Sequence, residues 1–288
     1  MTCKKLSYIP RNADAMIKNA LREDIGRGDI TTESIIPAHH LSSASLSAKE
    51  GFILAGLPFA ERTFHLVDRG IKFRSLKREG SRVKRGEMLA TVRGKTKSIL
   101  MAERVMLNIL QRMSGIATLT DNYVRQVRGY KARIVDTRKT VPGLRYFDKY
   151  AVRVGGGENH RFGLYDAILI KDNHIEAAGG ISRAVKLART KSGGEIRIEV
   201  ETGTLAEVRE ALSSETDIIM LDNMPLERIQ KAVKLIRKNN KAVTIEASGN
   251  VSLSNVRAIA QTGVDMISVG ALTHSVRAAD ISLRIVPL

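Results

Sequence analysis

Six short apolar segments of this 288-residue chain each end in a group that could take part in chemistry. The segments, with the groups that end them, are 132–138 (Arg138, then Lys139), 167–171 (Lys171), 196–201 (Glu201), 217–223 (Asp222), 243–249 (Ser248 and Gly249, then Asn250) and 265–270 (Gly270). In α/β barrels the working residues lie at the carboxyl ends of parallel strands, where the following loops converge. The recurrence therefore predicts one site formed by all six segment ends.

Cationic side chains dominate this predicted site. They are Arg138, Lys139 and Lys171, together with His160 and Arg161 from the segment GGGENHRFG. Guanidinium groups pair bidentately with carboxylates and phosphates, and several cations brought together are costly without anions to pair with. A small substrate with several negative charges is the natural complement. Glu201 and Asp222 are the exceptions, and carboxylates among cations can hold Mg²⁺ bridging to a pyrophosphate or contact sugar hydroxyls.

Glycine ends the last two segments, in SGN (248–250) and VGA (269–271). A glycine lets backbone N–H groups approach an anion closely, and barrels commonly hold phosphate after their last two strands. Either motif alone is also compatible with an ordinary turn, but together they favour a phosphate pocket. The sequence has no dinucleotide-binding GxGxxG after a strand, no Walker motif and no HExxH.

Hydrophobic periodicity predicts the elements that carry these residues. Residues 12–24 and 102–115 have the pattern of helices, the second ending at Gly115, with a strand-rich region between them. From residue 132 onward, apolar strands alternate with amphipathic helices such as TLAEVREAL, in which Thr204 and Glu207 form a capping box. This pattern predicts a parallel sheet covered by helices. Six strands are fewer than a closed barrel needs, so we expect an open or incomplete α/β barrel unless residues 145–165 add a strand.

Two polar patterns leave alternatives open. Helix 102–115 carries a stripe of Arg104, Asn108, Gln111 and Arg112, which fits a solvated face and a site-facing one equally well. Residues 72–97 hold ten Lys and Arg against two Glu. A nucleic-acid surface is one interpretation, but single-strand binders interleave aromatic residues and only Phe73 is present. A small β-rich unit with a solvated basic face is therefore favoured.

Composition limits the class of protein. The chain is 43% hydrophobic and 27% charged, which is typical of globular proteins, and its net charge of +17 favours anionic ligands. Cys3 is the single cysteine, so an internal disulfide and two-cysteine zinc motifs are excluded. Because there is no signal-peptide pattern and no apolar run of membrane-spanning length, we expect a soluble cytoplasmic protein without a membrane partner.

Longer motifs resemble the quinolinate phosphoribosyltransferase family, also called nicotinate-nucleotide pyrophosphorylases. The motifs are REDIGRGDIT (22–31), ERVMLNILQRMSGIAT (103–118), DTRKTVPGLR (136–145), KYAVRVGGGENHRFGLYDAILIKDNH (149–174), IEVE (198–201), IMLDN (219–223), EASGN (246–250) and ISVGALTHS (267–275). The resemblance runs nearly from end to end. The departures, Val141, Asp148 and Val154, touch no charged site position.

This resemblance implies a type II phosphoribosyltransferase of NAD biosynthesis. Quinolinate and phosphoribosyl pyrophosphate would become nicotinate mononucleotide, pyrophosphate and carbon dioxide, with Mg²⁺. It also implies a homodimer, or an oligomer built from dimers, with sites shared between subunits. In that arrangement an N-terminal α/β sandwich (1–115, with the tail 275–288 packed back on it) covers the partner's open barrel (116–274). No nucleic-acid partner is expected.

The same resemblance implies a role for each site residue. Arg104 would reach quinolinate from the partner subunit, and Glu201 and Asp222 would bind the ribose and the metal. The dicarboxylate site would contain Arg138, Lys139, Thr140, His160, Arg161 and Lys171. The 5′-phosphate site would contain Ser248, Gly249, Asn250 and Gly270. The catalytic set would be Lys139, Lys171, Glu201 and Asp222.

Two rival functions remain. A molybdenum-associated group of homologues shares the TRKT and GGG-x-x-HR patterns, but LIKDNH and EDIGRGDIT favour the quinolinate enzyme. The second rival, a basic nucleic-acid-binding protein, is permitted by the net charge of +17.

Overall fold

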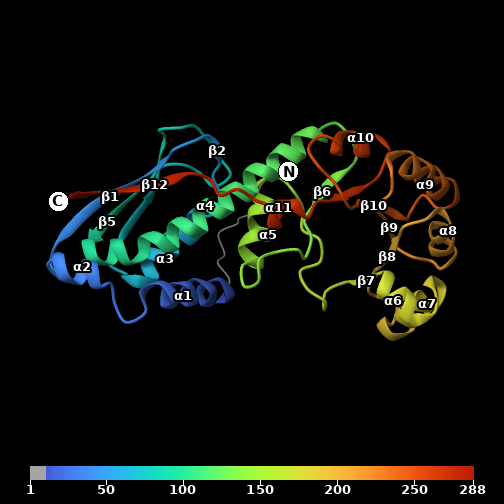
Figure 1. Ribbon diagram of the computed structural model, residues 1–288, viewed down its shortest axis with the longest axis horizontal. Helices are drawn as coiled ribbons and strands as arrows, with labels where there is room; N and C mark the ends of the chain where they lie inside the picture. Colours follow the sequence, from blue (N-terminus) through green and yellow to red (C-terminus); the bar gives the residue numbers. More distant parts are fainter. Residues whose placement is uncertain (1–10) are drawn as a thin grey trace. The chain divides into compact units, whose positions relative to one another are not determined.

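The computed structural model describes residues 11–288 (Figure 1), so Cys3 lies outside the described residues. The chain forms two compact units. Unit 1 contains the chain up to Leu119 together with Thr140–Gly156 and Ser275–Leu288, and unit 2 contains Thr120–Lys139 and Gly157–His274.

Unit 1 is built on an antiparallel sheet with the strand order β12 (Ile281–Pro287), β1 (Leu41–Ala48), β5 (Met88–Lys95) and β3 (Lys72–Ser75). Strands β2 (Phe52–Ile53) and β4 (Arg82–Val83) form a separate two-stranded antiparallel sheet. Alternate residues of β1 are buried, as expected for a strand with one face on a core. The core joins Leu46, Val92, Phe64 and Met106 from the sheet and from two helices. The predicted α/β sandwich is thus confirmed.

The helices of this region are α1 (Arg11–Ile25), α2 (Ile30–Ile35), α3 (Leu57–Val67), α4 (Thr96–Gln126) and α5 (Arg145–Val154). The predicted helix at 12–24 is confirmed. The strand-rich description of the following region was incomplete, because it missed α2 and α3. Phe59 and Phe64 are fully buried and form the apolar face of α3. In such a short segment, the pattern of apolar and polar residues does not separate a helix from a strand.

Helix α4 does not end at Gly115, and that prediction was wrong. The helix continues to Gln126, and Gly115 is required for another reason: a Cβ at this position would lie 2.2 Å from the carbonyl oxygen of Arg277. The glycine lets a distant segment pass close to the helix. The polar stripe on α4 is mixed, because Arg104 and Asn108 are exposed while Gln111 donates to the Ile281 carbonyl at 2.8 Å.

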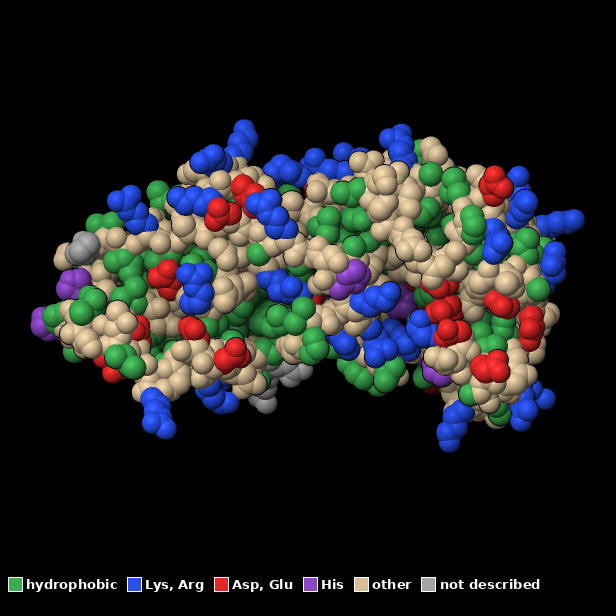
Figure 2. All heavy atoms as spheres, in the orientation of Figure 1, with side chains coloured by type: hydrophobic (Ala, Val, Ile, Leu, Met, Phe, Trp, Pro, Cys, Tyr) green, Lys and Arg blue, Asp and Glu red, His purple; other side chains and the backbone are tan. Residues whose placement is uncertain are grey.

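Residues 72–97 fold into β3, β4 and β5, which confirms the predicted β-rich unit. Arg74, Lys84 and Arg93 are exposed on it. Lys and Arg side chains are spread over the whole face of the molecule that Figure 2 shows.

Unit 2 contains the six predicted strands in one parallel sheet. Its strand order is β6 (Arg133–Val135), β11 (Met266–Ser268), β10 (Thr244–Ser248), β9 (Ile218–Asp222), β8 (Ile198–Thr202) and β7 (Ile168–Ile170). The helices that follow these strands are α6 (Asp172–Ala178), α7 (Ile181–Ser192), α8 (Leu205–Ser213), α9 (Leu226–Asn239), α10 (Val256–Gln261) and α11 (Ala271–His274). The capping box of Thr204 and Glu207 is present at the start of α8.

The barrel is open. Within residues 11–288, β6 and β7 are the two edges of the sheet and do not pair with each other. Residues 145–165 contain no further strand of the sheet: they form α5 and an irregular loop with one isolated bridge between Glu158 and Val135.

The two compact units differ from the sequence boundaries in residues 116–119 and, over a longer stretch, in one internal segment. Residues 140–156 pack with unit 1, although the sequence analysis assigned them to the barrel. The reason is aromatic packing, since the Phe59 ring lies 5.1 Å from the Phe147 ring and 4.9 Å from the Tyr150 ring, centroid to centroid. The tail also belongs to unit 1, because β12 pairs with β1.

No helix within residues 11–288 combines the length and the apolar character needed to cross a membrane.

Candidate active site

Strand register gathers polar side chains on one face of the unit 2 sheet. Glu201 of β8 pairs with Met220 of β9, and Met220 pairs in turn with Glu246 of β10. Two residues further along β9 and β10, Asp222 pairs with Ser248. Because paired residues of parallel strands point to the same side and every second residue repeats it, these five side chains share a face. A cavity of about 620 Å³ opens on that face.

Ten of the thirteen residues predicted for the site line this cavity. They are Arg138, Lys139, His160, Arg161, Lys171, Glu201, Asp222, Ser248, Gly249 and Asn250. Gly270 is adjacent, since a Cβ there would lie 3.2 Å from Lys139 Cδ. Arg104 and Thr140 belong to unit 1, where Arg104 is exposed on α4 and the Thr140 hydroxyl accepts a hydrogen bond from Arg145 Nε at 3.0 Å.

The cations of the cavity differ in their protein partners. Lys171 Nζ pairs with Glu201 Oε2. Arg161 donates from Nη1 to the Ala167 carbonyl at 3.1 Å, and burial together with the nearby Arg138 guanidinium lowers the pKa of Arg161. Two guanidinium groups that disfavour each other's charge create a place where a bound anion relieves the repulsion.

A tight left-handed turn follows β10. Gly249 has φ of +88° and Asn250 has φ of +51°. A Cβ on Gly249 would lie 2.1 Å from Asn223 Oδ1, and Asn250 Nδ2 donates to the same oxygen at 3.0 Å. Consecutive residues of positive φ turn backbone N–H groups toward one point, an arrangement suited to phosphate. Asn223, which follows β9 and itself has φ of +51°, was missed by the sequence analysis.

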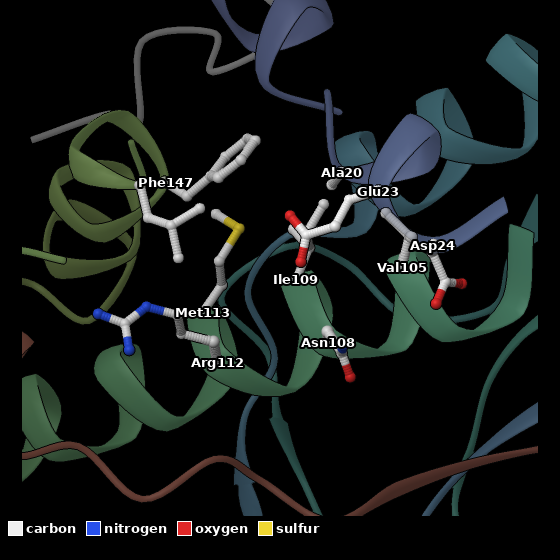
Figure 3. Close-up of a pocket in the computed structure, with 10 residues that line it drawn as sticks. Ala20, Glu23, Asp24, Val105, Asn108, Ile109, Arg112, Met113 and Phe147 are labelled. Carbon is white, nitrogen blue, oxygen red and sulfur yellow. The ribbon is translucent and has the colours of Figure 1, made fainter. Parts of the chain in front are cut away.

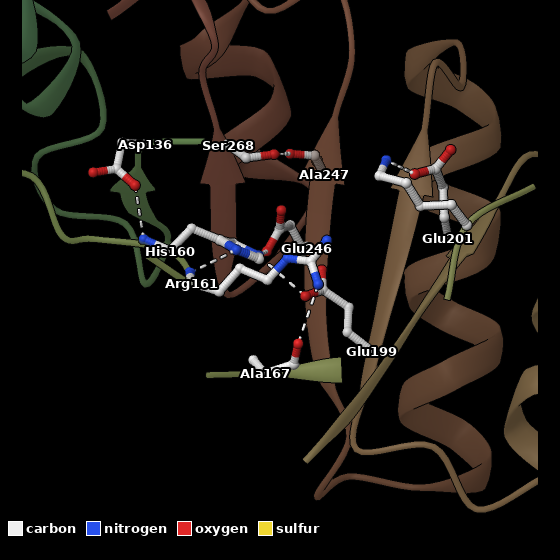
Figure 4. A network of polar contacts seen from close by, with 10 residues as sticks. Asp136, His160, Arg161, Ala167, Glu199, Glu201, Glu246, Ala247 and Ser268 are labelled. Atoms are coloured by element: carbon white, nitrogen blue, oxygen red, sulfur yellow. Dashed lines mark hydrogen bonds and ion pairs between the residues drawn. The ribbon is translucent and has the colours of Figure 1, made fainter. Parts of the chain in front are cut away.

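Beneath the cations lie two buried acids that the sequence analysis also missed. Glu199 is 3% exposed and Glu246 is 0% exposed, and their Oε2 atoms lie 3.1 and 3.3 Å from His160 Nε2 (Figure 4). Each stands among buried residues of its strand, in IEVET and TIEAS. A charged residue at an inward position of a buried strand is the signal that could have found them.

Comparison with known proteins agrees with the geometry. Two family models match the chain: Quinolinate phosphoribosyl transferase, N-terminal domain, over residues 29–114, and Quinolinate phosphoribosyl transferase, C-terminal domain, over residues 116–284. The chain belongs to the quinolinate phosphoribosyltransferase family.

Members of the quinolinate phosphoribosyltransferase family match over almost the full chain. A Synechocystis protein named probable nicotinate-nucleotide pyrophosphorylase [carboxylating] is 48% identical over 95% of this chain and 92% of its own length. Quinolinate phosphoribosyltransferase [decarboxylating] 2a, mitochondrial, of Nicotiana tabacum is 48% identical over 92% of this chain and 80% of its own. The crystal structure of NadC from Streptococcus pyogenes superimposes with a TM-score of 0.93 at 41% identity, covering 99% of this chain and 100% of that one.

Proposed function

We propose that the unit 2 cavity converts quinolinate and phosphoribosyl pyrophosphate to nicotinate mononucleotide, pyrophosphate and carbon dioxide, a step of NAD biosynthesis. The observation that carries this proposal is the lining of one cavity by four cations, by the carboxylates of Glu201 and Asp222 and by a glycine turn. These groups complement a dicarboxylate, a ribose and a phosphate, respectively.

The decisive experiment is formation of nicotinate mononucleotide by the purified protein, with quinolinate or nicotinate as the acceptor. Arg138, Lys139, Arg161 and Lys171 carry more positive charge than one carboxylate neutralises. Quinolinate is therefore the expected substrate, and nicotinate, which leaves part of the cationic site unpaired, is expected to be used poorly. Equal turnover of the two pyridines would contradict the proposal.

Glu201 and Asp222 act at the ribose. As pyrophosphate leaves, positive charge develops on the sugar ring, and a carboxylate held nearby stabilises it. The ion pair with Lys171 orients Glu201, and the Asp222 Oδ2 atom accepts a hydrogen bond from its neighbour Asn223 at 2.6 Å. Lys139 and Lys171 neutralise the substrate's anionic groups.

The donor set of Glu201 and Asp222 fits Mg²⁺. Both are hard carboxylate ligands on the same face of neighbouring strands. Within residues 11–288, Glu201 Oε1 and Asp222 Oδ1 accept no hydrogen bond from the protein. Mg²⁺ prefers one or two carboxylates completed by water and substrate phosphates. When bound, the ion neutralises the departing pyrophosphate.

The Gly249 turn holds the 5′-phosphate, which does not react. Ser248 and Asn250 flank Gly249 in this turn. Gly270, which has no side chain, leaves room beside Lys139 for the phosphate to come close to the backbone. An anchored phosphate fixes the position of the ribose carbon that accepts the pyridine nitrogen.

Loss of carbon dioxide follows from the charge of the product. Once its nitrogen is alkylated, the pyridine ring stabilises the carbanion that forms when the adjacent carboxylate leaves. Arg138 and Arg161 bind the dicarboxylate, and weaker solvation of the carboxylate once the cavity is filled favours its loss.

A homodimer with shared sites completes the proposal. Arg104 is exposed and forms no ion pair with a carboxylate of residues 11–288. Beside it on α4, Val105, Ile109 and Met113 help to line a unit 1 pocket of about 400 Å³ (Figure 3). A free guanidinium next to an open apolar pocket suits a surface that a second subunit covers. We also propose a cytoplasmic location, because the multiply charged substrate cannot cross a membrane unaided and must be made in the same compartment.

A further inference from the structure

The loop that carries His160 and Arg161 is held by buried carboxylates. It runs between α5 and β7 without regular secondary structure. Asp136, which is fully buried, accepts from the His160 backbone N–H at 2.9 Å and from Asn159 Nδ2 at 2.6 Å. Glu199 and Glu246 contact the His160 ring (Figure 4). Three buried acids under one short loop are expensive to desolvate and need an explanation.

Hydrogen bonding defines the state of the His160 ring. The Arg161 backbone N–H donates to Nδ1 at 2.9 Å, so Nδ1 acts as an acceptor. Nε2 then carries the ring proton and directs it toward Glu199 Oε2 at 3.1 Å, with Glu246 Oε2 at 3.3 Å. The two carboxylates beside Nε2 thus favour the tautomer with its proton on that nitrogen.

The same contact decides against a metal ion in this cluster. The ligand atoms of His160, Glu199 and Glu246 lie within 4.8 Å of one another, close enough to hold a cation. A metal on Nε2 would leave the ring proton on Nδ1, where the Arg161 N–H already points. The cluster is therefore a hydrogen-bonded anchor.

We propose that Glu199 and Glu246 are positioning residues for quinolinate: they fix the His160 ring, and the ring fixes the backbone of Arg161, whose guanidinium lines the cavity. Both ring nitrogens of His160 face protein groups, so its contribution is to hold Arg161 in place. A guanidinium fixed before the substrate arrives loses less conformational freedom on binding. This inference rests on the proposed function.

Kinetics of Glu246→Gln and Glu199→Gln test the proposal. Glutamine keeps the shape but replaces one acceptor with an NH₂ group that competes with the Nε2 proton. We expect KM for quinolinate to rise about tenfold or more, with KM for phosphoribosyl pyrophosphate and kcat each within about threefold. Glu246→Asp, which keeps the charge, should restore part of the quinolinate affinity. An unchanged KM for quinolinate, or equal rises for both substrates, would overturn the proposal.

A double-mutant cycle separates positioning from a general structural role. If Glu246 acts through the ring, Glu246→Gln should add nothing to the KM of a His160→Ala protein, whereas independent effects would multiply. The matched control is Asp217→Asn, which removes a carboxylate paired with Arg189 at 2.8 Å just before β9 and keeps an amide oxygen for the Ile198 N–H that Asp217 accepts. This control should leave KM for quinolinate unchanged.

The outcomes are distinguishable from failure of the proposed function. If the wild-type protein forms no nicotinate mononucleotide, the reaction itself is wrongly assigned. If the wild type is active and the Gln variants, checked by circular dichroism and melting temperature, keep the wild-type KM for quinolinate, the positioning role is wrong. Should Glu246→Gln fail to fold, Glu199→Gln and the Asp variant carry the test.

Discussion

Arg112 donates from Nε and Nη2 to the two carboxylate oxygens of Asp148, each at 2.8 Å, and so ties α5 to α4. The Asp148 side chain is fully buried and that of Arg112 is 21% exposed. Burial raises the pKa of Asp148, and the guanidinium opposes that rise. The buried carboxylate is therefore stabilised by this arginine together with the Val141 backbone N–H.

The first prediction concerns this pair. Arg112→Gln leaves the Asp148 carboxylate uncompensated and should lower the free energy of unfolding by about 3 to 5 kcal/mol. Arg277→Gln is the control in the same unit, because Arg277 pairs with Glu50 at 3.3 Å while 84% exposed, and it should cost about 1 kcal/mol or less. Urea unfolding measures both. If the two variants lost the same free energy of unfolding, burial would not be what makes the Arg112–Asp148 pair important.

The second prediction concerns the phosphate turn. Gly249→Ala places a methyl group against Asn223 and should raise KM for phosphoribosyl pyrophosphate about tenfold or more, with quinolinate binding retained. Gly193→Ala is the matched control, since Gly193 also has positive φ (+63°) but nothing within 4 Å of a Cβ. Both variants should lose about 1 kcal/mol of stability from backbone strain. A control that shares the KM effect would show that strain alone is responsible.

The third prediction concerns charge developing on the ribose. Glu201→Gln should lower kcat more than it raises KM for phosphoribosyl pyrophosphate, because an interaction felt chiefly in the transition state appears in kcat. We expect a fall of about 100-fold, comparable to loss of one electrostatic stabiliser. Steady-state kinetics decide. A change confined to KM would place Glu201 with the phosphate anchor instead.

The fourth prediction concerns sites shared between subunits. Arg104→Ala and Lys139→Ala should each be inactive, and mixing the two proteins should restore part of the activity. Subunit exchange creates one site with every wild-type group in about half of the dimers. Exchange must be shown independently, for example with differently tagged subunits. No recovery after proven exchange would contradict the action of Arg104 in trans.

The fifth prediction concerns pH and Glu79 of unit 1. Burial raises the pKa of Glu79 to about 7, although its carboxylate accepts N–H groups of Gly56 and Leu57 at the start of α3. The unfolded chain titrates at its ordinary, lower pKa, so folding takes up a proton and stability falls as pH rises toward 7.

Glu79→Gln cannot ionise and should remove this loss. The melting temperature of the variant relative to the wild type should therefore increase between pH 5 and pH 8, by the equivalent of about 2 kcal/mol. A difference that stays constant across this range would show that Glu79 keeps its ordinary pKa.

Periodicity predicted the barrel well because its strands are short, apolar and buried on both faces. In Ile218–Asp222, side chains alternate between the two faces of the sheet, and four of the five residues are buried. A short, continuous apolar run of this kind is typical of a strand buried on both faces. Because the carboxyl ends of parallel strands lie on the same side of a sheet, the strand assignments also predicted that Lys171, Glu201 and Asp222 share one site.

Contacts between distant segments were beyond the sequence. Gly115 fits a helix end as well as a helix interior, and only the approach of Arg277 explains it. Glu199 and Glu246 gain their role from His160, which lies on a loop, so no spacing rule connects the three. Residues 140–156 join unit 1 through Phe59, a contact across about ninety positions of sequence.

The pairing of β12 with β1 means that the first sheet is completed late in translation. Strand β1 emerges from the ribosome early, but its neighbour at Ile281–Pro287 is translated only after every strand of the barrel unit. At typical translation rates the edge of β1 waits roughly 10 to 50 s for that strand. During this interval the strands of the barrel unit are translated while the first sheet lacks one of its strands. Until Ile281–Pro287 is made, the nascent chain therefore presents an additional unsatisfied edge at β1, which pairing with β12 then covers.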